Sequence, residues 1–296
     1  MALMRVALLG SSGFLGSHVV DELQKASVET IGMDIVTPRW NYPDLFTRTD
    51  VTDTEGLRAA LMQVGPDVVI DLAGILGTAE TFRSPGLTAN VNVLGALNAM
   101  MYCLDANAVY IGVDTGSPEW LNPYAITKRA ATDLARALAK ELGLRATILR
   151  VFNAFGPRQA GTTHVVKIIP NFIRAALEER PVPIFGTGEQ TVDLVSAEDC
   201  ARAFRTAISS APHTGEVIDV GSGQPRSVAS VADLILNIVG RGSVIALPDR
   251  PGVGASTSAD LTRCKQILGF TPQADLGTLP DVVAWYMNHG FEPWQD

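Results

Sequence analysis

The sequence contains few cysteines and few histidines, and neither residue type forms a recognisable ligand pattern. The three cysteines, Cys103, Cys200 and Cys264, lie far apart and form no CxxC motif. This spacing argues against a disulfide framework and against a cysteine-ligated metal site. The 4 histidines show no ligand spacing either. We therefore expect reduced, buried thiols, no metal, and a cytoplasmic location.

Positive charge is also scarce. The chain has 23 Lys and Arg residues against 31 Asp and Glu residues, a formal net charge of −8. No basic cluster stands out, which argues against a nucleic-acid partner bound through overall charge. No apolar run approaches the roughly 18 to 20 residues that span a bilayer, and the first residues lack a signal-peptide pattern. We expect no nucleic-acid partner and no membrane partner.

The first half of the chain alternates short apolar runs with helical patterns. Strands are predicted at 5–9, 30–34, 68–72, 108–112 and 145–151, and helices at 14–26, 54–64, 86–105 and 123–142. The strands are rich in Val, Ile and Leu without polar alternation, which is typical of parallel strands covered by helices on both faces. The pattern predicts an α/β protein with a doubly wound parallel sheet.

The second half is richer in glycine, proline and polar residues. A strand and turn are predicted at 215–223, and a helix at 228–240 that ends at Gly240. We expect two domains: 1–155, which binds a dinucleotide, and 156–296, a smaller mixed α/β domain that binds substrate. Segments can cross between the two.

Three glycines at a spacing of three, Gly10, Gly13 and Gly16, separate the first strand from the first helix. They permit a tight turn, close approach of a pyrophosphate, and close packing of helix on strand. The helix N-terminus then offers free N–H groups to the phosphates. The predicted cofactor contacts in this loop are Gly10, Ser12, Gly13, Phe14, Leu15 and Gly16. By itself a glycine triplet also fits an ordinary helix-start turn.

Asp34 ends the second predicted strand, 18 residues after Gly16. A carboxylate there accepts hydrogen bonds from the adenosine ribose hydroxyls and repels a 2′-phosphate. This favours NAD over NADP, although Arg39 follows five residues later. Strand, glycines, helix, strand and terminal Asp together favour a dinucleotide site over the simple turn.

Tyr124 and Lys128 are four residues apart in a predicted helix that begins near Pro123. Their spacing places both side chains on one helix face. A nearby ammonium, together with a nicotinamide cation, favours the phenolate form of the tyrosine. Such a tyrosine can exchange a proton with a sugar hydroxyl while hydride moves to or from NAD. The alternative is a surface Tyr and Lys on an amphipathic helix.

Several longer motifs extend this pattern along nearly the whole chain: GSSGFLG at 10–16, TDVTD at 49–53, VVIDLAG at 68–74, NVLGALN at 92–98, NPYAITK at 122–128, LRVFNAFGPRQ at 149–159, PIFGTGEQTVDLV at 183–195 and RPG at 250–252. With them the chain resembles the extended short-chain dehydrogenase/reductases, in particular the NAD-dependent sugar-nucleotide epimerases and dehydratases. The resemblance implies a Rossmann-type sheet and NAD as cofactor.

The resemblance also implies roles for individual residues. Asp50 and Val51 would bracket the adenine, while Leu72, Ala73 and Gly74 would line the dinucleotide. Asn92 would lie in the helix beneath the active site. Tyr124 would be the acid/base and Lys128 would hold the nicotinamide ribose. Asn153 would meet the substrate's phosphates or sugar, and Arg250 the diphosphate; Arg158 is a further candidate substrate contact.

Two departures from the family pattern concern the strand before Tyr124. Gly112 and Val113 occupy the places where relatives carry Ser or Thr. The nearest hydroxyls are Thr115 and Ser117, and we favour Thr115 as the catalytic hydroxyl, although it also fits a turn before Gly116. Dehydratases of the family place Asp-Glu directly after their Thr, and this chain has no such pair there. The dehydratase hypothesis is weakened accordingly.

Two more departures lie elsewhere. Val192 stands where relatives commonly carry an Arg that contacts a substrate phosphate, so one bidentate contact is lost. Arg250, Arg158, Lys167 or Arg174 are candidates to compensate for it. Asp71 replaces a frequent His in the third-strand motif, and the sequence offers no physical reason for that exchange.

These observations predict an NAD-dependent nucleotide-sugar epimerase, acting at C4 through a transient keto-sugar. The alternatives are a 4,6-dehydratase, a ketoreductase, and a non-catalytic NAD-binding protein. The expected substrate is a nucleotide-diphosphate sugar, with the sugar and base left open. Helices 86–105 and 123–142 carry apolar outer faces, and relatives pair these helices, so a homodimer is expected.

Overall fold

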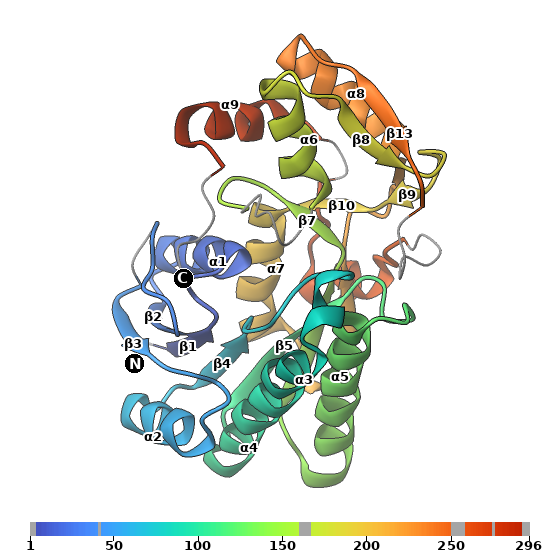
Figure 1. Ribbon diagram of the computed structural model, residues 1–296. Coiled ribbons are helices and arrows are strands. Elements are labelled where there is room, and N and C mark those ends of the chain that lie inside the picture. Colours follow the sequence, from blue (N-terminus) through green and yellow to red (C-terminus); the bar gives the residue numbers. More distant parts are fainter. Residues whose placement is uncertain (1–3, 41–42, 160–166, 250–257, 274–275, 292–296) are drawn as a thin grey trace.

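A seven-stranded sheet forms the centre of the protein (Figure 1). The computed structural model describes residues 4–40, 43–159, 167–249, 258–273 and 276–291. The strand order is β11-β6-β5-β4-β1-β2-β3, and every neighbouring pair is parallel. The strands are β1 (Arg5–Leu9), β2 (Glu29–Asp34), β3 (Leu45–Arg48), β4 (Val68–Asp71), β5 (Val109–Thr115), β6 (Ala146–Val151) and β11 (Thr214–Val220). The predicted doubly wound parallel sheet is confirmed.

Helices cover both faces of this sheet, which explains why its strands read as continuous apolar runs. Alternate residues of β1 show the two faces: Val6 and Leu8 pack with α1 (Phe14–Lys25) and α7 (Ala197–Ser210). Ala7 and Leu9 pack on the other side, in a core that includes residues of α2 (Thr54–Val64), α4 (Ala96–Ala106) and α5 (Pro123–Leu142). The chain order reverses between β1 and β4, which is where ligands bind in open α/β sheets.

The helix predicted at 86–105 is a continuous run of three segments, α3 (Pro85–Ala89), a π-helical segment η2 (Asn90–Gly95) and α4. A short 3₁₀ turn, η1 (Glu80–Arg83), precedes it. The run Pro85–Ala106 is long and apolar enough, by length and composition alone, to cross a membrane. This corrects the expectation that no apolar run approaches that length. Ala99, Met100 and Cys103 of this run are buried in the core of the sheet, which accounts for its apolar composition.

A second lobe has its own core, above the sheet in Figure 1. Its helices are α6 (Ile168–Leu177), α8 (Val228–Val239) and α9 (Leu279–His289), beside the parallel pair β8 (Val182–Phe185) and β13 (Val244–Leu247). The strand pair β7 (Asn153–Phe155) with β10 (Leu194–Ser196) packs in both cores, whereas the pair β9 (Thr191–Val192) with β12 (Arg226–Ser227) packs with the second lobe. A π-helical turn, η3 (Cys264–Leu268), packs on the large sheet.

The chain returns to the large sheet after residue 156, since α7 and β11 both belong to its layers. Residues 156–296 therefore do not form a separate body, and the boundary at 155 stays a prediction about which part binds which ligand. The strand predicted at 215–223 is β11, and the helix predicted at 228–240 is α8. The edge strand β3 was not predicted, because its four residues, Leu45–Arg48, are only partly apolar.

Candidate functional site

Two glycines of the loop, Gly10 and Gly16, lie where a side chain would collide with backbone atoms. Gly10 has φ +76°, and a Cβ there would lie 2.7 Å from the backbone nitrogen of Ala73. A Cβ on Gly16 would overlap the carbonyl oxygen of Gly10, and one on Gly13 would lie 3.3 Å from that same oxygen. Gly10 therefore makes the turn and Gly16 brings α1 against it, as the sequence predicted.

The N-terminus of α1 is available to an anion. Gly13 is its N-cap and makes no side-chain capping bond. The first N–H groups of a helix have no partner within the helix, and here no side chain caps them, so a phosphate can. This is the arrangement that a dinucleotide pyrophosphate requires, and the loop residues fit NAD on this ground.

Asp34 lies at the end of β2 and ties the glycine loop to it. Its Oδ2 accepts a hydrogen bond from the backbone N–H of Ser12 at 2.9 Å, and its Oδ1 accepts one from Val36 at 3.1 Å. Partial burial raises the pKa of this carboxyl, while the backbone hydrogen bonds oppose that rise. A carboxylate held at this point is placed to accept hydrogen bonds from an adenosine ribose.

The segment after β4 approaches the helix that carries Tyr124. A Cβ on Gly74 would lie 3.1 Å from Oδ1 of Asn92 and 3.2 Å from Nζ of Lys128. Asn92, in η2, accepts from the N–H of Ile75 at 2.8 Å and donates to the Ile75 carbonyl at 3.1 Å and to Thr127 Oγ1 at 3.0 Å. Asn92 thus joins the end of β4, η2 and α5. Leu72 and Ala73 lie in the same segment, directly against Gly10.

The two residues predicted to bracket the adenine lie between β3 and α2. Val51 is buried, and its carbonyl accepts a hydrogen bond from Asn98 Nδ2 at 2.9 Å. Asp50 is exposed and its Oδ1 accepts from the N–H and the hydroxyl of Thr52 at 2.8 and 2.7 Å. Asp50 therefore shapes this turn with its own side chain.

Tyr124 and Lys128 lie in the first turns of α5. Asn122 caps this helix by accepting from the N–H of Ala125 at 2.9 Å, and Pro123 occupies the first turn. Gly143 ends the helix in a left-handed conformation, as the sequence predicted. Tyr124 is half-buried and Lys128 is only 6% exposed, so the pair does not lie on an open surface.

The hydroxyl that accompanies Tyr124 is that of Thr115. The two side chains are hydrogen-bonded, which lowers the pKa of Tyr124, but burial has a larger effect and raises it to about 12. The nearby carboxylate of Asp114 raises it further. The chain's own groups therefore keep the phenol protonated, and the expected stabilisation of phenolate by Lys128 is not seen. Ser117, the other hydroxyl residue considered for this role, donates its backbone N–H to Thr115 Oγ1, at 3.5 Å.

Burial acts on Lys128 in the opposite direction and lowers its pKa. Two carboxylates, Asp71 and Asp114, oppose this effect by favouring the ammonium. Asp71 is 5% exposed and Asp114 is 2% exposed. Lys128 is therefore buried beside two carboxylates, which the spacing of Tyr124 and Lys128 did not reveal.

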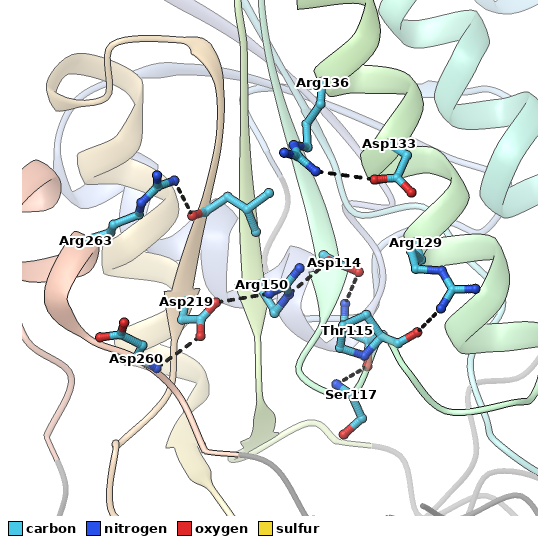
Figure 2. Close-up of polar contacts among 12 residues, drawn as sticks. Asp114, Thr115, Ser117, Arg129, Asp133, Arg136, Arg150, Asp219, Asp260 and Arg263 are labelled. Atoms are coloured by element: carbon cyan, nitrogen blue, oxygen red, sulfur yellow. Dashed lines mark hydrogen bonds and ion pairs between the residues drawn. The ribbon is translucent and has the colours of Figure 1, made fainter.

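Asp114 belongs to a row of charges across three neighbouring strands (Figure 2). Arg150 on β6 pairs through Nε with Asp114 on β5, at 3.0 Å, and through Nη1 with Asp219 on β11, at 3.7 Å. The three residues are in register, Asp114 with Arg150 and Arg150 with Asp219. Sequence reasoning missed this row, because which strands are neighbours is decided by the tertiary fold.

The predicted substrate residues are not gathered at one point. Asn153 is exposed at the start of β7, and its backbone N–H donates to the carbonyl of Asp193 at 3.0 Å. Arg158 pairs with Asp21 of α1, at 2.8 Å, and is largely buried. Arg250 lies outside the described residues. Asn153 is therefore exposed beside β10, whereas Arg158 is engaged with α1.

Position 192 has an arginine opposite it. Val192 in β9 pairs in antiparallel register with Arg226 in β12, and Arg226 is exposed. Residues directly opposite in such a pair project to the same face. Of the candidates to replace the missing arginine, Arg174 pairs with Glu178 at 2.9 Å. Lys167 is half-buried, and burial lowers its pKa while Glu80 opposes that effect.

Taken together, the uncapped helix at a glycine loop, Asp34 at the end of β2, and the Thr115–Tyr124–Lys128 group define a dinucleotide-dependent enzyme on a Rossmann-type sheet. Comparison with known proteins narrows this class. The sequence profile of the NAD dependent epimerase/dehydratase family matches residues 6–221. The chain belongs to that family, whose cofactor is NAD.

Relatives with different reactions cover nearly the whole chain. A putative UDP-glucose 4-epimerase from Methanocaldococcus jannaschii is 28% identical over 96% of this chain and 99% of its own length. A dTDP-glucose 4,6-dehydratase from Streptomyces griseus is 28% identical over 95% of this chain and 93% of its own. The crystal structure of UDP-glucose 4-epimerase with UDP-glucose from Thermotoga maritima is 27% identical, has a TM-score of 0.90, and covers 96% of this chain and 99% of that one.

Proposed function

We propose that this enzyme is a nucleotide-sugar epimerase that inverts C4 of a nucleotide-diphosphate hexose. The observation that carries this proposal is the hydrogen-bonded pair Thr115–Tyr124, without the Asp-Glu pair that follows the Thr in dehydratases of the family. Gly116 and Ser117 occupy those two positions. Relatives named as UDP-glucose 4-epimerases support the same assignment.

In this proposal Tyr124 exchanges a proton with the C4 hydroxyl and Thr115 hydrogen-bonds to the same oxygen. NAD, when bound, supplies a reversible hydride acceptor. The glycine loop, Asp34, Leu72, Ala73, Gly74, Asn92 and Lys128 are the residues that would hold it, with Asp50 and Val51 on the adenine side. Because Tyr124 is protonated in the chain alone, its ability to accept a proton depends on positive charge brought beside it.

The keto-sugar formed at C4 is reduced again on its opposite face, so no net oxidation occurs. A proton leaves the substrate hydroxyl for Tyr124 in the first half-reaction and returns in the second. The half-buried position of Tyr124 beside buried Asp114 limits the access of water to this oxygen. Asn153 and a basic residue of the second lobe are assigned to the sugar and the diphosphate.

Incubating the purified enzyme with UDP-, dTDP-, GDP- and CDP-hexoses tests this function. The C4 epimer of at least one of them should form without added reductant and without accumulation of NADH. A 4-keto-6-deoxy sugar would instead place the enzyme with the dehydratases, and steady NADH consumption on a keto-sugar would make it a reductase.

We also propose that the enzyme is a cytoplasmic homodimer. Leu87, Leu94 and Met101 follow one another at heptad spacing on the run Pro85–Ala106 and are 55%, 40% and 40% exposed. Ile126 on neighbouring α5 is 42% exposed. Such a stripe is suited to burial against a second copy. Light scattering that gives a monomer mass at micromolar concentration would reject the dimer.

The proposed cytoplasmic location rests on the cysteines. The three cysteines are buried and form no disulfide, which suits a reducing compartment.

A further inference from the structure

Asp71 is a buried carboxylate whose presence the sequence pattern alone did not explain. It ends β4 and is 5% exposed. Its Oδ2 accepts the hydroxyl of Tyr110 at 3.0 Å, and its Oδ1 accepts the backbone N–H of Ala73 at 3.1 Å. Both oxygens therefore have a fixed donor, and the carboxylate cannot turn away from the end of β4.

The segment that Asp71 holds leads directly to Lys128. Ala73 donates to Asp71, and the next residue, Gly74, lies so close to Lys128 that a Cβ would be 3.2 Å from Nζ. Asp71 and Lys128 act on one another electrostatically: Asp71 is the first of the charges that raise the pKa of Lys128, and Lys128 lowers the pKa of Asp71. Burial is the larger effect on each group: on balance the pKa of Lys128 is lowered and the pKa of Asp71 is raised.

The other anion beside Lys128, Asp114, already has a cation of its own. Asp114 forms an ion pair with Arg150 at 3.0 Å, and Arg150 also faces Asp219 (Figure 2). Within the described ranges, Asp71 takes part in no arginine ion pair; the charged or titratable groups that face it are Lys128, Tyr110 and Cys103. Lys128 is the only cation among these three.

We propose that Asp71 is the buried counter-ion that keeps Lys128 protonated, and so a positioning residue for the Tyr124–Lys128 pair. This inference rests on the proposed function only for its consequence in catalysis. A buried ammonium without a counter-ion loses its proton more readily, and with it the charge of the group assigned to the nicotinamide ribose.

A neighbouring departure from the family pattern fits the same arrangement. Gly112, which stands in place of a Ser, pairs in register with Asp71 on the adjacent strand. A Cβ at Gly112 would lie 2.8 Å from the Tyr110 ring and 3.1 Å from its hydroxyl oxygen. Gly112 therefore leaves the space in which Tyr110 reaches Asp71. The three residues form one unit: Tyr110 donates a hydrogen bond to Asp71, and Gly112 leaves room for the Tyr110 ring.

The charge state of Lys128 can be measured directly by NMR. The chain has only Lys25, Lys128, Lys140, Lys167 and Lys265, so lysine labelled at ¹³Cε gives a resolvable spectrum. The Lys128→Arg variant identifies the Lys128 signal by its loss. In Asp71→Asn, which keeps the acceptor for Tyr110 but removes the charge, the titration of Lys128 should move to lower pH than in the unmodified enzyme.

Asp219→Asn is the matched control, because Asp219 is a partly buried carboxylate of the same sheet that does not act directly on Lys128. Its Lys128 titration should move far less than that of Asp71→Asn, since Asp219 is linked to Lys128 only through Arg150 and Asp114. Should Asp71→Asn not fold, Tyr110→Phe decides the question: with one donor fewer on Asp71, a smaller shift in the same direction is expected. An unmoved Lys128 titration in the folded Asp71 or Tyr110 variant overturns the proposal.

In the enzymatic assay, Asp71→Asn should lose kcat at neutral pH by about tenfold, the equivalent of one pKa unit, with the basic limb of its pH profile moved to lower pH. A merely structural role would lower activity at all pH values alike, and that result also contradicts the proposal. A shift in the NMR titration without turnover of any nucleotide sugar would leave Asp71 as the counter-ion and refute the proposed function.

Discussion

The backbone N–H of Ser12 donates to Oδ2 of Asp34 at 2.9 Å, so the glycine loop and the end of β2 are one structural unit. The same carboxylate is therefore both a brace for the loop and the group assigned to the adenosine ribose. Replacing it should affect the dinucleotide site as a whole.

Asp34→Asn should weaken binding of NAD about tenfold to a hundredfold, since a hydrogen bond to a charged group contributes roughly 1.5–3 kcal/mol. It should also reduce the preference for NAD over NADP, because the repulsion of a 2′-phosphate is lost. Calorimetric titration with both dinucleotides measures the two effects.

Asp44→Asn provides the control for this change. Asp44 also accepts a backbone N–H of β2, that of Thr30 at 2.8 Å, but at the opposite end of the strand. NAD affinity in this variant should stay within error of the unmodified enzyme. Equal losses in the two variants would show that the effect comes from general damage to β2.

Gly112→Ser should destabilise the protein by about 1–3 kcal/mol, the usual cost of overpacking a core. The added side chain would press on the Tyr110 ring, which is buried and held by its hydrogen bond to Asp71. Chemical denaturation measures the change. Gly86→Ser is the control, since a Cβ at Gly86 has nothing within 4 Å; it should be nearly neutral. A neutral Gly112→Ser would contradict the packing described for Tyr110.

Thr115→Val should reduce kcat by about tenfold or more, because Val keeps the shape of the side chain but loses the hydroxyl bonded to Tyr124. Thr115→Ser should restore most of the rate. Ser117→Ala tests the other hydroxyl in this loop and should have little effect on kcat. If Ser117→Ala proves the more damaging, the catalytic hydroxyl has been assigned to the wrong residue.

Stability should fall on acidification through His18. Burial lowers the pKa of His18, whose Nε2 lies 3.0 Å from the carbonyl oxygen of Pro157. Around and between the lowered pKa of the folded state and the unfolded value near 6.5, the unfolded chain binds more protons than the folded chain, so the free energy of unfolding decreases as the pH falls through that window.

The His18→Gln variant isolates this contribution, because Gln keeps an amide donor but does not titrate. Urea denaturation of both proteins at pH 7.5 and pH 5.5 should show a larger loss of stability in the unmodified enzyme. Carboxyls and His213 are common to the two proteins, so their effects cancel in the difference. Equal losses would mean that His18 is not held neutral by the fold.

The sequence was sufficient for the parts of the fold whose signals are local. The apolar runs of β1, β2, β4 and β6, the start of α5 near Pro123 and its end at Gly143 can be recognised from neighbouring residues alone. α7 was overlooked although it has such a signal: Ser196 accepts the N–H of Asp199 at 3.0 Å, the side-chain cap of a helix start.

The rest of the site depends on strand order and register, which local patterns do not contain. Tyr110 meets Asp71, and Arg150 meets Asp114 and Asp219, only because β4, β5, β6 and β11 are adjacent. For the same reason the protonated state of Tyr124 was not predicted. Spacing shows that Lys128 is near, but only the packed structure shows how strongly burial acts on the phenol.

The most direct measurement of the central claim compares the unmodified enzyme with Tyr124→Phe in the formation of a C4-epimeric nucleotide sugar, followed by NMR of the sugar ring. The unmodified enzyme should convert at least one nucleotide hexose to its C4 epimer, and Tyr124→Phe should be slower by about 10²–10⁴-fold while NAD remains bound. An epimerisation rate unchanged by Tyr124→Phe would contradict the account.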